Sequence, residues 1–219
     1  MDRANKLERL VKAGISISMY TILPLLAFLA WVIGVPLFIY GGMMTSVNEA
    51  QGIFQTVFIF SAPMILFFGI IPICIQIKHK TSINDLGLKG YWNRRSIILL
   101  CCNITIALVI FIRLIQEFSD LKSVIPIIIQ LCAIGISEEI LCRGVIYHEI
   151  DNAFHSKILS IFISSIIFAF LFHSGDSDFV NLVVRLPLGL AFAIMRCYTG
   201  NVYNSIVMHV WYNSLMFIL

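Results

Sequence analysis

Long apolar segments separated by short polar connections dominate the hydropathy pattern of this 219-residue chain. A membrane-spanning helix needs about 20 mainly apolar residues. Seven segments approach or exceed that length, and they cover residues 14–40, 53–77, 96–116, 124–150, 158–173, 179–197 and 202–219. The last three are short and joined by tight turns. The pattern therefore predicts an all-α fold, a polytopic transmembrane helix bundle of about seven spans.

The composition identifies the lipid bilayer as the solvent of this chain. Apolar residues make up 59% of the sequence and charged residues only 12%, and the mean hydropathy is +0.94. Soluble domains are about 25% charged. We therefore expect residues 1–219 to form a single transmembrane domain of a multi-pass cell-membrane protein. Residues 1–13 are expected to form an amphipathic lead-in on the cytoplasmic side.

Basic residues gather in alternate connections between the apolar segments. Four precede the first segment, none lies in residues 41–52, and five lie from Lys78 to Arg95. Because basic loops stay in the cytoplasm, the N-terminus and residues 78–95 are predicted to be cytoplasmic and the C-terminus to face outward. The net charge of +3 does not indicate a nucleic-acid partner, and the six cysteines show no disulfide or metal-binding spacing. We expect neither a cofactor nor a bound metal.

The fourth apolar segment carries ionisable residues near its middle, within Ser137-Glu138-Glu139-Ile140-Leu141-Cys142-Arg143. An ionisable side chain at the bilayer centre costs about 2.5–3.5 kcal/mol, so three within six residues need a physical reason. Glu139 and Arg143 lie four residues apart on one helical face, where they can form a supporting ion pair. Glu138 points about 100° away on the same helix and stays free for another partner.

Two later segments contribute further polar side chains. His173 ends one of them, and His209 and Asn213 lie four residues apart on one face of the last. Counted at about 1.5 Å per residue from the cytoplasmic ends, the depths of Glu138, His173 and His209 permit one cluster. Such a cluster suits hydrolysis, because a carboxylate can take a proton from water while N–H donors stabilise an oxyanion. The candidate catalytic residues are therefore Glu138, His173, His209 and Asn213, with Glu139 and Arg143 as structural support.

Other interpretations of these residues stay open. A single intramembrane histidine is more often an interhelical hydrogen-bonding residue than a catalyst, although polar groups on three helices are a costly way only to hold helices together. Ser137 or Cys142 could be a nucleophile, and Glu138 with the two histidines could bind a metal, although no HExxH is present. A polar site at the membrane midplane also suits a transporter. Arg185 is expected to pair with Asp178 or to reach the membrane surface.

In their order along the chain, these residues resemble the motifs of the CAAX proteases and bacteriocin-processing enzymes, also called the CPBP or Abi family. The family motif EExxxR corresponds to Glu138, Glu139 and Arg143, and the motif of a histidine followed four residues later by an asparagine corresponds to His209 and Asn213. The remaining motif usually has a phenylalanine four residues before a histidine. Here Phe168 lies five residues before His173 and Phe170 three. The resemblance covers residues 124–219.

The resemblance implies an intramembrane endopeptidase, an EC 3.4 hydrolase, that acts on a membrane-associated peptide or protein tail. It further implies that Glu138 and His173 activate water and that His209 and Asn213 stabilise the oxyanion. The alternative is a non-enzymatic membrane protein for bacteriocin immunity or peptide binding, which would use the same polar pocket.

Overall fold

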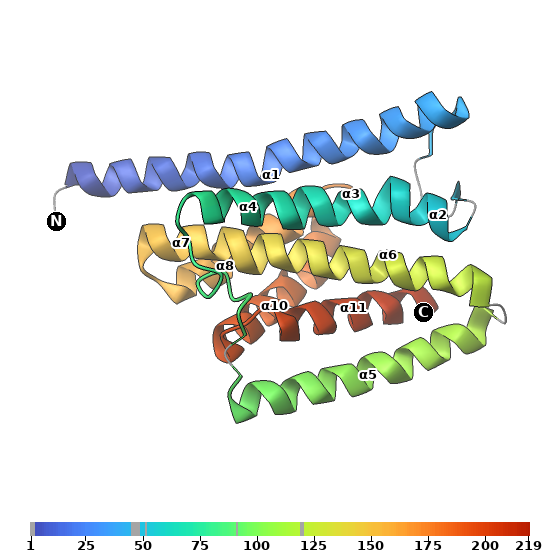
Figure 1. Ribbon diagram of the computed structural model, residues 1–219. Coiled ribbons are helices and arrows are strands. Elements are labelled where there is room, and N and C mark those ends of the chain that lie inside the picture. The colour runs from blue at the N-terminus through green and yellow to red at the C-terminus, as the bar shows by residue number, and fades with distance from the viewer. Residues whose placement is uncertain (1–2, 45–48, 51, 91, 119–120) are drawn as a thin grey trace.

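The protein is a bundle of helices (Figure 1). The computed structural model describes residues 3–44, 49–50, 52–90, 92–118 and 121–219. Within these ranges every regular element is a helix, which confirms the all-α prediction.

The first three spans agree with the apolar segments of the sequence. Helix α1 (Arg3–Tyr40) is continuous, so residues 3–13 of the predicted lead-in belong to the same helix as the first span, and residues 1–2 lie outside the described part. The second span joins five short helical pieces, and the third is α5 (Arg94–Phe118). The pieces of the second span are α2 (Ile53–Gln55), η2 (Thr56–Ser61), α3 (Ala62–Ile65), η3 (Leu66–Ile70) and α4 (Ile71–Lys78), of which η2 and η3 are π-helical.

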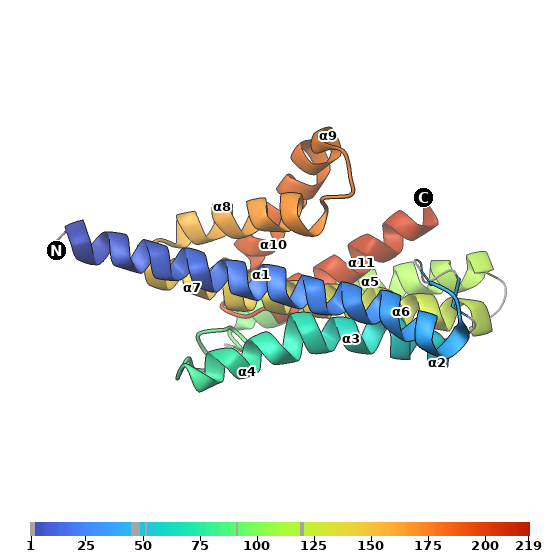
Figure 2. The same cartoon turned by 90° about the horizontal axis from the view of Figure 1, so that it is seen from above.

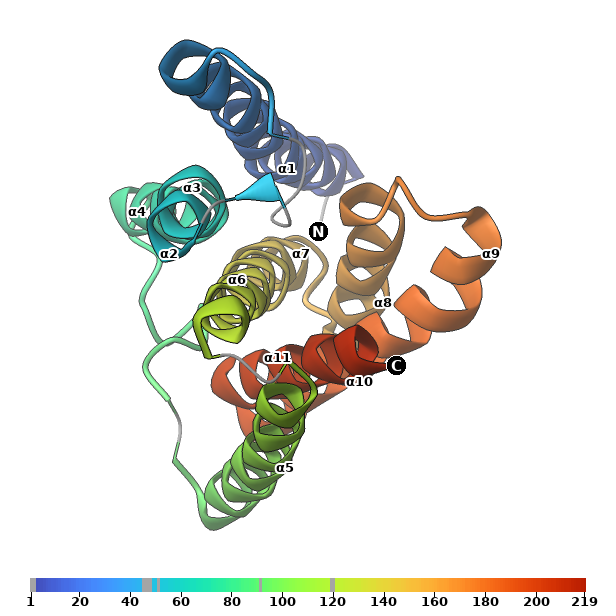
Figure 3. The same cartoon turned by 90° about the vertical axis from the view of Figure 1, so that its right-hand side faces the viewer.

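The fourth span lies at the centre of the bundle. It consists of α6 (Leu121–Glu139), the π-helical η4 (Ile140–Ile146) and α7 (Tyr147–Phe154). Viewed along the bundle, it is surrounded by the other helices, whereas α1 and α5 lie at the periphery (Figure 3). The residues that the sequence marks as ionisable therefore lie in the most enclosed helix.

The C-terminal half adds three shorter helical runs around the fourth span. The first is α8 (Lys157–Ile167), which continues into the π-helical η5 (Phe168–Phe172). The second joins α9 (Asp178–Val180), the π-helical η6 (Asn181–Arg185) and α10 (Leu186–Thr199). The last is α11 (Tyr203–Ile218). In Figure 2 the run from α8 to α9 projects to one side of the bundle.

Five helical runs in the described part of the chain are long and apolar enough to cross a membrane. They are Leu7–Tyr40, Ile53–Lys78, Arg94–Phe118, Leu121–Phe154 and Asp178–Thr199. The other two predicted spans correspond to Lys157–Phe172 and α11, which are shorter helices. The protein is thus a membrane protein, and of the seven predicted spans five correspond to runs long and apolar enough to cross a membrane.

Close helix contact sets the position of α11 against α6. A Cβ atom on Gly135 would lie 2.6 Å from Val210 Cγ2 and 3.3 Å from the Val210 backbone nitrogen. Gly135 lies one turn before Glu139, and Val210 follows His209 directly. The missing side chain at Gly135 therefore lets α11 bring His209 up to the two glutamates.

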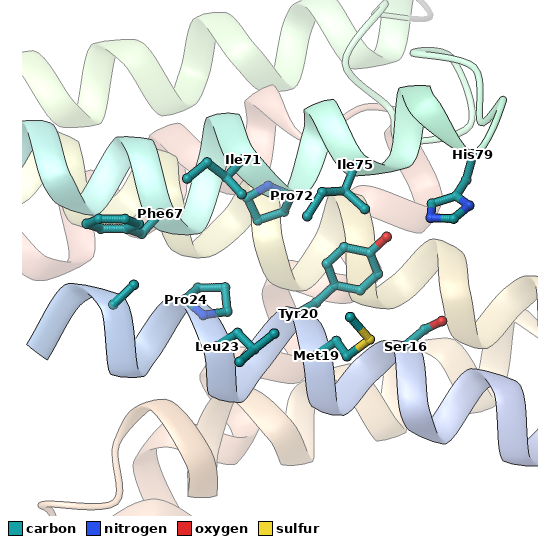
Figure 4. A pocket seen from close by; sticks show the side chains of 11 residues that line it. Ser16, Met19, Tyr20, Leu23, Pro24, Phe67, Ile71, Pro72, Ile75 and His79 are labelled. Carbon is teal, nitrogen blue, oxygen red and sulfur yellow. The ribbon is translucent and has the colours of Figure 1, made fainter. Parts of the chain in front are cut away.

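Helix α1 packs less closely against the second span. A groove of about 270 Å³ runs between α1 and the segment from η3 to α4 (Figure 4). Pro24 and Pro72 face each other across this groove, and His79 lies at one end. None of its lining residues is a candidate catalytic residue, so this groove is separate from the site described below.

Candidate functional site

Glu139 and Arg143 form the predicted ion pair inside the bundle. Arg143 Nη1 lies 3.3 Å from Glu139 Oε1, and both side chains have no solvent exposure. Arg143 also donates from Nη2 to the carbonyl of Gly189 on α10, at 3.0 Å. Its guanidinium lies over the ring of Phe168, 4.5 Å from the ring centroid. The pair thus joins the fourth span to the two helical runs that follow it.

Glu139 has a second partner that the sequence did not predict. Its Oε1 lies 3.0 Å from Nδ1 of His209 on α11, and the His209 ring stacks on Phe192 with centroids 4.8 Å apart. An ionised carboxylate can only accept a hydrogen bond, so Nδ1 is the donor. The other ring nitrogen, Nε2, then faces Glu138. Glu139 therefore orients His209 in addition to pairing with Arg143.

Glu138 lies between the two histidines. Its Oε2 is 3.9 Å from Nε2 of His173 and 3.9 Å from Nε2 of His209. These distances exceed a direct hydrogen bond. Glu138 Oε2 and His173 Nε2 are buried polar atoms with no hydrogen-bond partner among the described residues. The structure thus brings Glu138, His173 and His209 from three helical runs into one cluster, with buried polar atoms directed at one another.

A π-helical turn positions His173. The widened turn η5 ends at Phe172, and His173 follows it, outside the helix. A π turn spaces neighbouring residues of one face by about five positions rather than four. Phe168 accordingly packs against His173, with ring centroids 4.9 Å apart, although five residues separate them. The π turn therefore accounts for the spacing of five residues between Phe168 and His173, where the family motif has four.

Two contacts hold the turn that follows His173. The side-chain amide of Asn181 donates to the His173 carbonyl at 3.0 Å, and Arg185 Nε lies 2.9 Å from Asp176 Oδ2. The prediction that Arg185 pairs with Asp178 is wrong. Asp178 begins α9, where its negative charge complements the helix N-terminus, while Asp176 lies in the turn that Arg185 reaches.

Asn213 faces the same space as Glu138 and His173. The three side chains line a cavity of about 660 Å³, together with Gln130 on α6 and Arg185 on η6. Asn213 is half-buried and has no hydrogen-bond partner among the described residues. The cavity is therefore lined by Glu138, His173 and the side-chain amide of Asn213, which is available to bind a ligand.

The alternative nucleophiles lie in different surroundings. Ser137 is fully buried and donates to its own helix, to the carbonyls of Ala133 at 2.7 Å and Ile134 at 3.1 Å. Cys142 is also fully buried and is not among the residues that line the cavity. Within the described ranges, no group of three or more His, Cys, Asp and Glu side chains has an arrangement suited to a metal ion.

Sequence reasoning missed the residues that shape this cluster. Phe168 and Phe192 enclose His209 and Arg143, and Phe192 is fully buried. In an apolar segment such phenylalanines cannot be told from residues that face lipid. Gly135 had a usable signal, since a small residue one turn before a charged pair marks a close helix approach.

The site region also matches a known family. Residues 120–215 match the family model named Rce1-like, which describes type II CAAX prenyl endopeptidases of the Rce1-like kind. No curated protein and no solved structure matches the chain significantly. The matched segment contains all six candidate site residues, and the family is one of CAAX-type intramembrane proteases. Residues 120–215 are thus an Rce1-like region of the CAAX protease and bacteriocin-processing type, CPBP or Abi.

Proposed function

We propose that the protein is an intramembrane endopeptidase that hydrolyses peptide bonds of membrane-associated peptides or protein tails with water activated by Glu138. The proposal rests on one observation above all. The buried Oε2 of Glu138 lies 3.9 Å from a nitrogen of each histidine. Polar groups more than about 3.5 Å apart can be bridged by a water molecule.

The proposed reaction uses the cluster in two steps. Glu138 takes a proton from water, assisted by His173, and the water oxygen bonds to the carbonyl carbon of the peptide. The tetrahedral intermediate then collapses, the C–N bond breaks, and the proton on Glu138 passes to the leaving amine. General acid and base catalysis of this kind contributes about 10²–10⁴-fold to a rate.

His209 and Asn213 are proposed to stabilise the oxyanion. Asn213 can donate from its side-chain amide into the cavity. His209 already donates from Nδ1 to Glu139. Its Nε2 can therefore donate to an oxyanion only when the ring carries both protons, so the proposed role requires the imidazolium form. Glu139 acts through His209 and Arg143 as a positioning residue.

The decisive experiment compares Glu138→Gln with the wild-type protein on membrane-associated peptides. Glu138→Gln keeps the size of the side chain but removes the base, and we expect turnover to fall about 10²–10⁴-fold while the protein stays folded. Ser137→Ala and Cys142→Ala serve as neighbouring controls that should retain most activity. An inactive Ser137→Ala with an active Glu138→Gln would move the assignment to serine chemistry.

Two other results would change the proposed function. Inhibition by a chelator that added zinc reverses would favour a metal-dependent reaction. Saturable peptide binding by wild type and Glu138→Gln, without cleavage by either, would favour the non-enzymatic function in immunity or peptide binding.

A further inference from the structure

The cavity beside Glu138 occupies only one half of the bundle. On the fourth span it is lined between Gln130 and Glu138, and on α11 between Tyr212 and Phe217. His173 follows the end of η5, and Val180, Val184 and Arg185 lie in the first half of the run that α9 begins. This half of the bundle is at the end where α1 finishes and the C-terminus lies (Figure 1). The cavity thus lies in the half of the bundle nearer this end.

The connection of residues 81–90 closes the opposite end of the bundle. Leu86 in this connection is fully buried. The Val202 amide donates to the Gly87 carbonyl at 3.1 Å, and the Tyr203 hydroxyl donates to the Leu88 carbonyl. Arg196 Nη2 donates to the Asp85 carbonyl at 3.1 Å. The connection is therefore fastened to the start of α11 and the end of α10.

The two ends also differ in charge. The closed end carries the basic residues Lys78, Lys80, Lys89, Arg94 and Arg95. The turn at residues 173–178, beside the cavity, contains two aspartates and no lysine or arginine. Because basic connections remain in the cytoplasm, the closed end is the cytoplasmic one.

We infer that the cavity admits substrate from the non-cytoplasmic side of the membrane. The substrate class is then a membrane-anchored peptide whose scissile bond lies in the outer half of the bilayer or just outside it. Apolar residues such as Ile134 and Met216 suit apolar side chains of this peptide. Backbone groups of an extended peptide in the membrane need hydrogen-bond partners, and Arg185 and Asn213 can supply them. This inference rests on the proposed function.

Access can be measured without any assay of activity. Val180 lines the cavity, Met43 is exposed beyond the end of α1, and Asn84 is exposed in the closing connection. Each is replaced separately by cysteine, and a membrane-impermeant maleimide is added to right-side-out or inside-out sealed vesicles. Wild-type protein with its six cysteines sets the background. We expect Val180→Cys and Met43→Cys to react only from outside, and Asn84→Cys only from inside.

Each other pattern overturns the inference. Reaction of Val180→Cys from the same side as Asn84→Cys would mean that the cavity opens at the basic end. Reaction of Val180→Cys from both sides would mean a path through the bundle. Reaction of Met43→Cys from inside would reverse the orientation, so that the cavity would face the cytoplasm.

An activity experiment separates this inference from the proposed function. A fluorogenic peptide with one acyl chain is mixed with the protein in detergent, and then placed in a single leaflet of sealed proteoliposomes of known orientation. Absence of Glu138-dependent cleavage in detergent would count against the proposed function and leave the labelling result intact. Cleavage in detergent, combined with cleavage only from the Asn84 side in vesicles, would overturn the access side alone.

Discussion

The first and fourth spans have equal length but opposite surroundings. Leu7–Tyr40 and Leu121–Phe154 each contain 34 residues, with mean hydropathies of 2.5 and 1.9 in their most apolar stretches. Only 17% of that stretch is buried in the first span, against 56% in the fourth. The more apolar helix is thus the one that faces lipid. In a bilayer, apolarity does not drive a helix inward, because lipid tails are as apolar as leucine.

Polar side chains explain the central place of the fourth span. Two of its buried charged side chains have hydrogen-bond partners on other helices: Arg143 donates to the Gly189 carbonyl of α10, and Glu139 accepts from His209 of α11. Unpaired charges in hydrocarbon are costly, so these contacts favour a central position for the helix that carries them. Polar residues therefore mark the interior of this bundle, and substitutions at matched positions of the two spans test this.

The largest effect on stability is expected at the buried ion pair. Removing one member of such a pair leaves the other charge uncompensated, a loss of about 3–5 kcal/mol in soluble proteins. Glu139→Gln and Arg143→Ala should therefore each lower the midpoint of thermal unfolding in detergent and the yield of folded protein. Since Glu139 also binds His209, activity should fall in both variants.

The double variant Glu139→Gln/Arg143→Met provides the control for that prediction. It leaves no unpaired charge of this pair, and contacting residues are not additive, so part of the lost stability should return. Activity should not return with it, because Nδ1 of His209 no longer faces the Glu139 carboxylate. Single variants that unfold at the wild-type temperature would show that the pair contributes nothing to stability.

A smaller effect is expected at a pair of glycines, one in each span. A Cβ atom on Gly135 would lie 2.6 Å from Val210 Cγ2, whereas one on Gly34 of α1 would meet nothing within 4 Å. Gly135→Ala should cost about 1–3 kcal/mol through overpacking and reduce activity by moving His209. Gly34→Ala should be neutral or stabilising by up to about 1 kcal/mol, since alanine favours helix. Thermal unfolding and peptide cleavage check both.

A second replacement tests the cause assigned to the Gly135 effect. Val210→Ala removes the methyl group that the new Cβ would meet, so Gly135→Ala/Val210→Ala should recover some of the stability that Gly135→Ala loses. If Gly135→Ala behaves like Gly34→Ala, then α6 and α11 do not approach as closely as 2.6 Å implies.

The sequence predicted the spans well because hydropathy depends on each residue separately. The predicted segment at residues 53–77 became the run Ile53–Lys78, and that at residues 124–150 lies within Leu121–Phe154. The spacing of Glu139 and Arg143 likewise predicted their ion pair, because four residues place two side chains on one helical face.

Contacts between helices were less predictable from the sequence. The hydrogen bond from His209 to Glu139 depends on which faces of α6 and α11 meet. Hydropathy does not reveal these faces, because lipid and the protein interior are equally apolar. The contact of Phe168 with His173 depends on a π turn, which changes the residue spacing that a sequence pattern assumes. Arg185 pairs with Asp176 and not with the predicted Asp178 for a similar reason, because the shape of the tight turn decides which aspartate it reaches.

The smallest change in stability is expected on the lipid-facing side of α1. It tests directly whether the first span faces lipid while the fourth is packed against protein. Leu26 is 57% exposed on α1, whereas Leu141 in the fourth span has no exposure. Leu141→Ala should cost about 2–5 kcal/mol, because it leaves a cavity among packed side chains. Leu26→Ala should change stability by less than about 0.5 kcal/mol, since lipid tails fill the space that the side chain leaves. Thermal unfolding of both variants in one detergent measures the difference. Equal losses would mean that this face of α1 is packed against protein, and α1 would then be an interior helix like the fourth span.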